Sequence, residues 1–200
     1  MMQPEIYADR IFYYKNAIAD PARVVHLLEE SDSAITENDA ILPWHEWVAS
    51  GEGEKYVFGE QKFTDETKLQ SSSEDVRYLY ETLKSALTLA GTDYAAKNNI
   101  EYAEPAPISI SKYRTGADMG AHVDYYGDPS IEPLMSAVLY LNDDVEGGEL
   151  DFPHHNVRIK PEAGSIIVFP SVEPFYHQSL PTTRGHKYMS PAFWMKKLDN

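Results

Sequence analysis

The 200-residue sequence contains no cysteine, and this absence excludes several kinds of chemistry. Disulfide bridges, thiolate metal sites and cysteine nucleophiles all need a residue that the chain lacks. A metal site would have to be built from His, Asp and Glu. Such ligands favour harder ions such as Fe(II) or Mn, although Zn also accepts them.

Long apolar runs and targeting signals are absent as well. No segment approaches the roughly 18 apolar residues of a membrane-spanning helix. The opening stretch, MMQPEIYADRIFYYKN, lacks the basic and apolar regions of a signal peptide. We therefore expect a cytoplasmic protein without a membrane partner, and the sequence leaves its oligomeric state open.

Basic residues are few, because 17 Lys and Arg stand against 32 Asp and Glu and give a formal net charge of −15. A chain this negative is repelled by phosphate backbones, so we expect no nucleic-acid partner. The charge mildly favours a basic or neutral substrate. Solubility alone is the simpler explanation of it.

The sequence predicts a single domain, 1–200, whose two parts differ in pattern. Residues 1–104 are expected to be helical or irregular, and residues 105–197 to form a β core. Because helices come first and strands follow, the predicted class is α+β, with the N-terminal helices packed on one sheet.

Two helices are expected in the N-terminal part. Asp20 is typical of a helix cap and Pro21 of the first helical residue. A second helix begins at Ser72 or Ser73 and carries apolar residues at helical spacing. Gly91 is expected to end it, because glycine is common just beyond helix ends.

Short strands separated by turns follow Pro105. They are expected at 108–113, 135–141, 149–152, 157–159, 164–169, 176–180 and 186–194. Several short strands at this spacing indicate a sandwich or barrel. Segment 40–63, by contrast, contains three glycines and is expected to be irregular. Its Trp44 and Trp47 fit a core role better than a substrate groove.

The tripeptide His122-Val123-Asp124 is a candidate metal-binding motif. Residues i and i+2 of a strand point the same way, so His122 and Asp124 would present an imidazole and a carboxylate to one ion. His177, 53 residues after Asp124, is the candidate third ligand. Two histidines and one carboxylate form the facial triad of non-haem Fe(II) oxygenases, which leaves positions open for O₂ and a co-substrate.

Lys187 and Tyr140 are candidates for binding that co-substrate. Lys187 lies on an expected strand, ten residues after His177, and could hold the distal carboxylate of 2-oxoglutarate. Strand parity places it on the same face as Met189 and Phe193. Tyr140 lies on the more polar face of an otherwise apolar strand and could donate a hydrogen bond to the same carboxylate.

Taken in order, these motifs resemble the prolyl 4-hydroxylases and related 2-oxoglutarate/Fe(II) dioxygenases over roughly residues 107–194. The matching residues are Tyr113, Gly116, His122-x-Asp124, Tyr140-Leu141-Asn142, Gly147-Gly148-Glu149-Leu150-x-Phe152-Pro153, Pro161-x-x-Gly164 and His177-x-x-x-Pro181-x-x-x-Gly185-x-Lys187. Two positions depart from the family pattern. Phe193 stands where a Trp is frequent, and Leu150 where a Thr is frequent.

The resemblance implies a double-stranded β-helix, or jelly-roll, core. It implies that His122, Asp124 and His177 bind Fe(II), and that Lys187 anchors 2-oxoglutarate. O₂ is then a co-substrate and ascorbate a candidate reductant.

Tyr113 and Tyr140 match positions that contact the co-substrate in relatives. Alternation places Tyr113 on the face of Ser109 and Ser111. Either the site face of this strand is therefore polar, or Tyr113 lies past the end of the strand.

Other polar residues are weaker candidates. His186 should point to the face opposite Lys187, which excludes it as a ligand. Arg184 could reach a carboxylate but ranks below Lys187. The remaining candidates are expected to be packed or solvated residues outside the site: His26, His154, His155, Asp128, Asp143 and Asp144.

The resemblance favours a prolyl residue of a peptide or protein as the substrate. Segments 44–60 and 125–133 are candidate lids. Tyr125 and Tyr126 either stack on a substrate ring or are ordinary loop aromatics.

Three alternatives remain. The first is the same chemistry on a free amino acid or small metabolite. The second, a non-catalytic jelly-roll binding module, gives Lys187 and Tyr140 no purpose. The third, a Zn hydrolase, lacks an evident general base.

Overall fold

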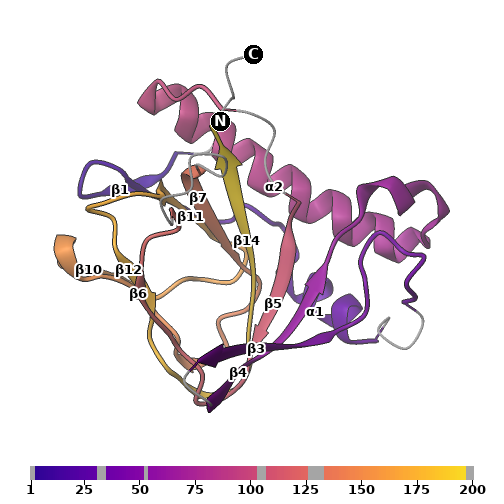
Figure 1. Ribbon diagram of the computed structural model, residues 1–200. Coiled ribbons are helices and arrows are strands. Elements are labelled where there is room, and N and C mark those ends of the chain that lie inside the picture. The colour runs from indigo at the N-terminus through magenta and orange to yellow at the C-terminus, as the bar shows by residue number, and fades with distance from the viewer. Residues whose placement is uncertain (1–2, 31–34, 52–53, 103–106, 126–132, 197–200) are drawn as a thin grey trace.

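The computed structural model describes residues 3–30, 35–51, 54–102, 107–125 and 133–196. Within these ranges, the fold consists of an eight-stranded sheet, a four-stranded sheet, a pair of short strands and two α-helices (Figure 1). The helices are α1 (Pro21–Glu30) and α2 (Glu74–Asn98). The 3₁₀ helices Glu66–Ser71 and Pro153–His155 connect other elements. No helix in the described ranges is long and apolar enough to cross a membrane.

The major sheet has eight strands and draws on both ends of the chain. Its strands are β1 (Glu5–Tyr7), β2 (Ile11–Tyr14), β3 (His45–Gly51), β4 (Glu54–Phe63), β5 (Ser109–Tyr113), β7 (Pro133–Tyr140), β11 (Ile166–Pro170) and β14 (Lys187–Met195). They lie in the order β1-β2-β11-β7-β14-β5-β4-β3. The pairings recorded between neighbours are all antiparallel.

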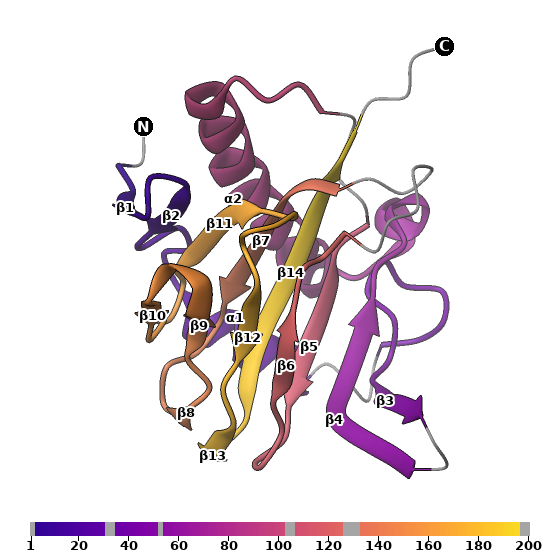
Figure 2. The same cartoon turned by 60° about the vertical axis from the view of Figure 1, so that its left-hand side comes forward.

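A minor sheet of four strands lies against one face of the major sheet (Figure 2). Its strands are β6 (Met119–His122), β9 (Leu150–Phe152), β10 (Val157–Ile159) and β12 (His177–Ser179), in the order β10-β9-β12-β6. Two further short strands, β8 (Glu146–Gly147) and β13 (Thr182–Arg184), pair with each other. Side chains from both large sheets share one buried cluster, as two sheets packed face to face require.

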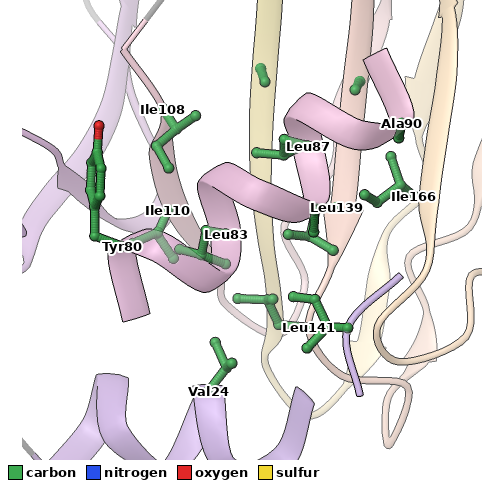
Figure 3. Packing of buried hydrophobic residues seen from close by; sticks show 14 of the residues in the cluster. Val24, Tyr80, Leu83, Leu87, Ala90, Ile108, Ile110, Leu139, Leu141 and Ile166 are labelled. Carbon is green, nitrogen blue, oxygen red and sulfur yellow. The ribbon is translucent and has the colours of Figure 1, made fainter. Parts of the chain in front are cut away.

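The helices cover the opposite face of the major sheet (Figure 3). Leu83 and Leu87 of α2 and Val24 of α1 point toward strand residues such as Leu139 and Ile166. This second cluster is larger and consists almost entirely of apolar side chains. β7 therefore has buried side chains on both of its faces, as its continuous apolar run predicts.

The strands expected between residues 108 and 194 are confirmed as β5, β7, β9, β10, β11, β12 and β14. The expectation that segment 40–63 is irregular is wrong, because β3 and β4 form an antiparallel hairpin there. Gly59 explains the error. A Cβ at this position would lie 1.9 Å from the carbonyl oxygen of Lys112, so glycine permits β4 to approach β5.

The expected end of the second helix is also wrong. Ser73 caps α2 by accepting a hydrogen bond from the backbone N–H of Val76. The helix then passes through Gly91 and ends at Asn98, where Asn99 adopts the left-handed conformation. A Cβ at Gly91 would lie 2.3 Å from the ring of Trp194, so this glycine permits close packing of the helix on β14.

Candidate functional site

His122 and His177 are brought together by strand pairing. In the minor sheet they are direct cross-strand partners on β6 and β12. Their ring centroids lie 4.4 Å apart. Asp124 completes a group whose ligand atoms all lie within 4.8 Å of one another. Its carboxylate oxygens are 3.5 Å from Nε2 of His122 and 3.7 Å from Nε2 of His177.

Asp124 is placed by a turn rather than by strand parity alone, since β6 ends at His122. The backbone N–H groups of Asp124 and Tyr125 both donate to the carbonyl oxygen of Ser171, at 3.1 Å. The hydroxyl of Ser136 donates to Asp124 Oδ2 at 2.5 Å. These bonds from β7 and the end of β11 fix the carboxylate toward the two imidazoles.

Both imidazoles present the same ring nitrogen to the centre of the group. Nδ1 of His122 lies 2.7 Å from the carbonyl oxygen of Gly120, and Nδ1 of His177 lies 3.2 Å from that of Phe175. A carbonyl can only accept, so Nδ1 carries the hydrogen in each bond. Nε2 of each ring is left as a lone-pair donor, which is the form that binds a metal.

The electrostatics of His177 and Asp124 suit metal binding, whereas those of His122 favour its protonated form in the metal-free site. Burial lowers the pKa of His177 and keeps its imidazole neutral. Burial alone would raise the pKa of Asp124, but the hydrogen bond with His122 and the neighbouring His177 and Ser136 outweigh it and lower the pKa. Burial also acts to lower the pKa of His122, yet the hydrogen bonds to Asp124 and Gly120 raise it overall.

The triad opens into a cavity of about 240 Å³ between the two sheets. Alternate residues of β5 (Ser109, Ser111, Tyr113) and of β14 (Met189, Pro191, Phe193) line it, as expected for one face of a sheet. The lining residues are Trp47, Gln61, Ser109, Ser111, Tyr113, Met119, His122, Asp124, Ser136, Ala137, Val138, Tyr140, Leu150, His177, Ser179, Met189, Pro191 and Phe193.

Tyr113 and Tyr140 both line this cavity, so the site face of β5 is the polar face that includes Ser109 and Ser111. Both tyrosines are almost completely buried. Burial raises the pKa of each, so both keep their hydroxyl protons at neutral pH. Neither hydroxyl has a hydrogen-bond partner among the described residues.

Lys187 lies next to the cavity, 2% exposed. Its Nζ donates to Ser179 Oγ and, at 3.2 Å, to the carbonyl oxygen of Gly148, and lies 4.4 Å from the ring centroid of Tyr113. It forms no ion pair within the described part of the chain. Burial lowers its pKa to about 8, partly opposed by Glu149. A buried ammonium group without a counter-charge is a binding site for an anion.

Thr182 is a site residue that the sequence did not reveal. Its Oγ1 is buried and has no hydrogen-bond partner among the described residues. A Cβ on Gly148 would lie 3.2 Å from that oxygen and 3.1 Å from the side chain of Lys187, so the hydroxyl and the lysine flank the same glycine. Thr182 falls at an unspecified position of the motif His177-x-x-x-Pro181-x-x-x-Gly185, so the motif did not single it out as a site residue.

Several weaker candidates lie elsewhere. Arg184 is largely exposed and pairs with Glu146 at 2.6 Å. His186 lines a different surface pocket, on the helix side of the sheet with Tyr188. Three other histidines have partners outside the cavity: His26 pairs with Glu30, His154 contacts Tyr176 and His155 stacks on Phe175.

The two candidate lid segments differ in what they contribute. Trp47 on β3 lines the cavity and meets the ring of Tyr113 edge-on, at 5.1 Å between centroids. Trp44 instead packs against the helix-side cluster. Tyr125 is described but is not among the cavity-lining residues. Tyr126 and the rest of 126–132 lie outside the described residues.

Comparison with known proteins agrees with this geometry. Residues 108–196 match the model of the 2OG-Fe(II) oxygenase superfamily. The match confirms the resemblance to 2-oxoglutarate/Fe(II) dioxygenases that the motifs indicated. The probable prolyl 4-hydroxylase 9 of Arabidopsis thaliana is 29% identical over 119 residues, or 46% of this chain. The matched part spans 41% of the plant protein's length.

Solved prolyl hydroxylases share the fold along most of the chain. The viral collagen prolyl hydroxylase of Paramecium Bursaria Chlorella virus-1, in complex with 2OG, has a TM-score of 0.63 at 14% identity, covering 96% of this chain and 98% of its own. A Pseudomonas putida prolyl-4-hydroxylase has a TM-score of 0.64 at 19% identity, covering 94% and 93%.

The prolyl hydroxylase of Trichoplax adhaerens, in complex with a hypoxia inducible factor peptide fragment, has a TM-score of 0.64 at 14% identity, covering 94% of this chain and 84% of its own. At such identities the likeness establishes the fold alone, and it confirms the jelly-roll core. The 2OG-Fe(II) oxygenase match and the plant relative support a dioxygenase enzyme.

Proposed function

We propose that this protein uses Fe(II), 2-oxoglutarate and O₂ to hydroxylate a C–H bond, with a prolyl residue of a peptide or protein as the favoured substrate. Succinate and CO₂ are the expected co-products. One observation carries the proposal. Three metal-ligating side chains converge at a cavity, and a buried lysine without a counter-ion lies beside the same cavity.

The donor set fits iron. Nε2 of His122, Nε2 of His177 and a carboxylate oxygen of Asp124 would hold the ion. Two imidazoles and one carboxylate match the ligands of non-haem Fe(II) oxygenases. Iron bound there would supply the O₂-dependent oxidative chemistry, while the protein supplies geometry and exclusion of water.

The surroundings of Lys187 fit a dicarboxylate. The ammonium group of Lys187 and the orphaned hydroxyl of Thr182 lie around the same glycine, and both can donate to a carboxylate. The partner-free hydroxyls of Tyr113 and Tyr140 supply further donors from the cavity wall. A 2-oxoglutarate carboxylate in this place would neutralise the buried charge of the lysine.

The remaining residues hold this arrangement. Ser136 donates to Asp124 and leaves the other carboxylate oxygen for the metal. The carbonyls of Gly120 and Phe175 fix the tautomers of the two histidines. Apolar side chains such as Leu150 and Met189 line the cavity and limit the access of water.

Support for a prolyl substrate comes from relatives. The plant relative is a probable prolyl 4-hydroxylase, and the Trichoplax adhaerens protein is a prolyl hydroxylase seen with a peptide fragment. Trp47 and Phe193 offer aromatic surface in the cavity for a substrate ring.

The test is turnover of a proline-rich peptide library with Fe(II), 2-oxoglutarate and O₂, with and without ascorbate. Mass spectrometry would read the gain of one oxygen by the peptide, and succinate would be measured in parallel. We expect both products to depend on metal and 2-oxoglutarate, and His122→Ala to abolish both.

Two outcomes would redirect the proposal. Succinate formation with free amino acids or metabolites, but not with peptides, would retain the chemistry and change the substrate. Absence of 2-oxoglutarate binding in metal-loaded protein would instead favour a non-catalytic binding module.

A further inference from the structure

The cavity has a neutral polar wall that the proposed chemistry does not use. Gln61 on β4 and Ser109 and Ser111 on β5 form this wall. Gln61 is the register partner of Ser111. Its Nε2 lies 3.4 Å from the hydroxyl oxygens of both serines, which is long for a hydrogen bond.

The wall lies on the β4 and β5 side of the cavity. The minor sheet ends at β6, whereas the major sheet continues past β5 with β4 and β3 (Figure 2). Lys187 on β14 is the register partner of Tyr113 on β5. Tyr113 is in turn the register partner of Gly59 on β4. Gln61 therefore lies two strands across from the lysine and two residues further along the sheet.

The wall carries no formal charge. Among the described residues that line the cavity, only the triad supplies charge at neutral pH. A free amino acid would bring a carboxylate without a basic partner among these lining residues, and burying an unpaired charge is costly.

The wall can instead satisfy a peptide group. The weak bonds to the serines leave the carboxamide N–H₂ of Gln61 available, and its oxygen accepts no hydrogen bond from a described residue. A carboxamide offers a donor and an acceptor side by side, as a peptide group requires. The two serine hydroxyls can donate or accept as needed.

We propose that Gln61, supported by Ser109 and Ser111, hydrogen-bonds a peptide group that flanks the target residue of the substrate. Gln61 is then a specificity-determining residue for targets held within a peptide chain. This inference rests on the proposed function and adds to it a way of rejecting free amino acids. A site built around hydrogen bonds discriminates strongly against ligands that leave its groups unpaired.

The experiment compares two sets of probes. One set is acetyl-Gly-X-Gly-amide with X as each standard residue, and the other is the corresponding free amino acids. Binding is measured by calorimetry to protein carrying Fe(II) and 2-oxoglutarate under nitrogen, and turnover is measured after O₂ is admitted. We expect binding and turnover of blocked peptides only.

Variants then test whether Gln61 is the residue that recognises the peptide group. Gln61→Leu should raise the dissociation constant of the best blocked peptide about tenfold to hundredfold, as for the loss of a buried hydrogen-bonded group. Gln61→Asn should retain part of the affinity. The matched control is Gln70→Leu on an exposed glutamine outside the cavity, which should change nothing.

Other outcomes would overturn the inference. They are equal binding of free amino acids, no binding of any blocked peptide, or a peptide affinity insensitive to Gln61→Leu in a variant that keeps its melting temperature. A loss of co-substrate affinity alone in Gln61→Leu would assign the wall to the co-substrate. Retained 2-oxoglutarate binding by the unmutated protein in any of these cases would leave the proposed function standing.

Discussion

The two faces of β14 differ in what their side chains contact. On one face, Ala192 and Trp194 pack against α2 in the helix-side cluster. On the other, Met189, Pro191 and Phe193 line the cavity and Lys187 lies beside it. Both faces are alternate positions of one strand, so they share the same backbone and the same register.

This difference shows that the residues around the cavity serve ligand binding at a cost in stability, whereas the helix-side residues serve stability. The helix-side face is filled so closely that even a Cβ at Gly91 would collide with Trp194. The cavity face carries the ammonium group of Lys187, which has hydrogen-bond partners but no counter-ion, and beside it lies the partnerless hydroxyl of Thr182 on β13. Such groups destabilise the ligand-free protein and become useful only when a ligand satisfies them.

The largest effect should come from Lys187→Met on the cavity face. Removing the ammonium group leaves the co-substrate carboxylate unpaired, at a cost of about 3–5 kcal/mol, so affinity for 2-oxoglutarate should fall more than about hundredfold. The free energy of unfolding without ligand should rise by about 1–2 kcal/mol, because an uncompensated buried charge has been removed. Calorimetry and urea unfolding would measure the two effects.

The control for this change is Lys160→Met, since Lys160 is an exposed lysine near the same strands. It should alter neither quantity. Unchanged 2-oxoglutarate affinity in Lys187→Met would remove the lysine from the anchoring role.

On the helix-side face, a smaller effect is expected, and it should concern stability rather than ligand affinity. Gly91→Leu should lower the free energy of unfolding by about 1–3 kcal/mol, because the added side chain must displace the buried ring of Trp194. The affinity of folded protein for 2-oxoglutarate should not change. Urea unfolding gives the first quantity and calorimetry the second.

Combining Gly91→Leu with Trp194→Leu should recover part of the loss, since the smaller side chain makes room. A variant Gly91→Leu as stable as the parent would show that this face is packed less closely than the structure indicates.

The same contrast explains which elements could be predicted from the sequence. The strand at Met135–Leu141 was predictable because burial on both faces leaves a continuous apolar run. The β3–β4 hairpin was not, because Gly59 has the sequence signature of a loop although its purpose is close contact with β5. Gly91 led to a wrong helix end in the same way. A glycine is needed there because the ring of Trp194, more than a hundred residues away in the chain, packs against it.

The residues of the candidate site also differ in whether they could be identified from the sequence. His122, Asp124, His177 and Lys187 could be proposed because spacing and side-chain chemistry together are informative. Thr182 could not, because its orphaned hydroxyl is evident only once Gly148 and the lysine are seen beside it. Gln61 was hidden by the failure to predict β4. Residues whose importance depends on a long-range neighbour leave little trace in a single sequence.

A pH titration of 2-oxoglutarate affinity tests the role of the buried Lys187 on the cavity face. The pKa of Lys187 is lowered by burial from 10.5 to about 8, so above pH 8 the ligand-free protein increasingly holds a neutral amine. Affinity for 2-oxoglutarate should then fall about tenfold per pH unit until the ligand-bound pKa is exceeded. Between pH 8 and 10.5 the unfolded chain binds this proton and the folded chain does not, so this group's contribution to stability rises with pH.

Calorimetry from pH 7 to 10 would measure this loss of affinity. Lys187→Arg should flatten the profile, because a guanidinium stays charged throughout this range. A wild-type profile as flat as that of the arginine variant would contradict the lowered pKa.

The smallest effect is expected at Arg184, the other cation that the sequence placed within reach of the co-substrate. Its side chain is 75% exposed and pairs with Glu146 in a surface salt bridge. Such a pair contributes about 0–1 kcal/mol, so Arg184→Ala should leave 2-oxoglutarate affinity unchanged and stability nearly so. A large loss of affinity on this substitution, measured in the same calorimetric titration as Lys187→Met, would mean that the anion reaches the outer end of β13. The buried lysine would then share its role with a solvated arginine, and the separation between the two faces of β14 would no longer account for co-substrate binding.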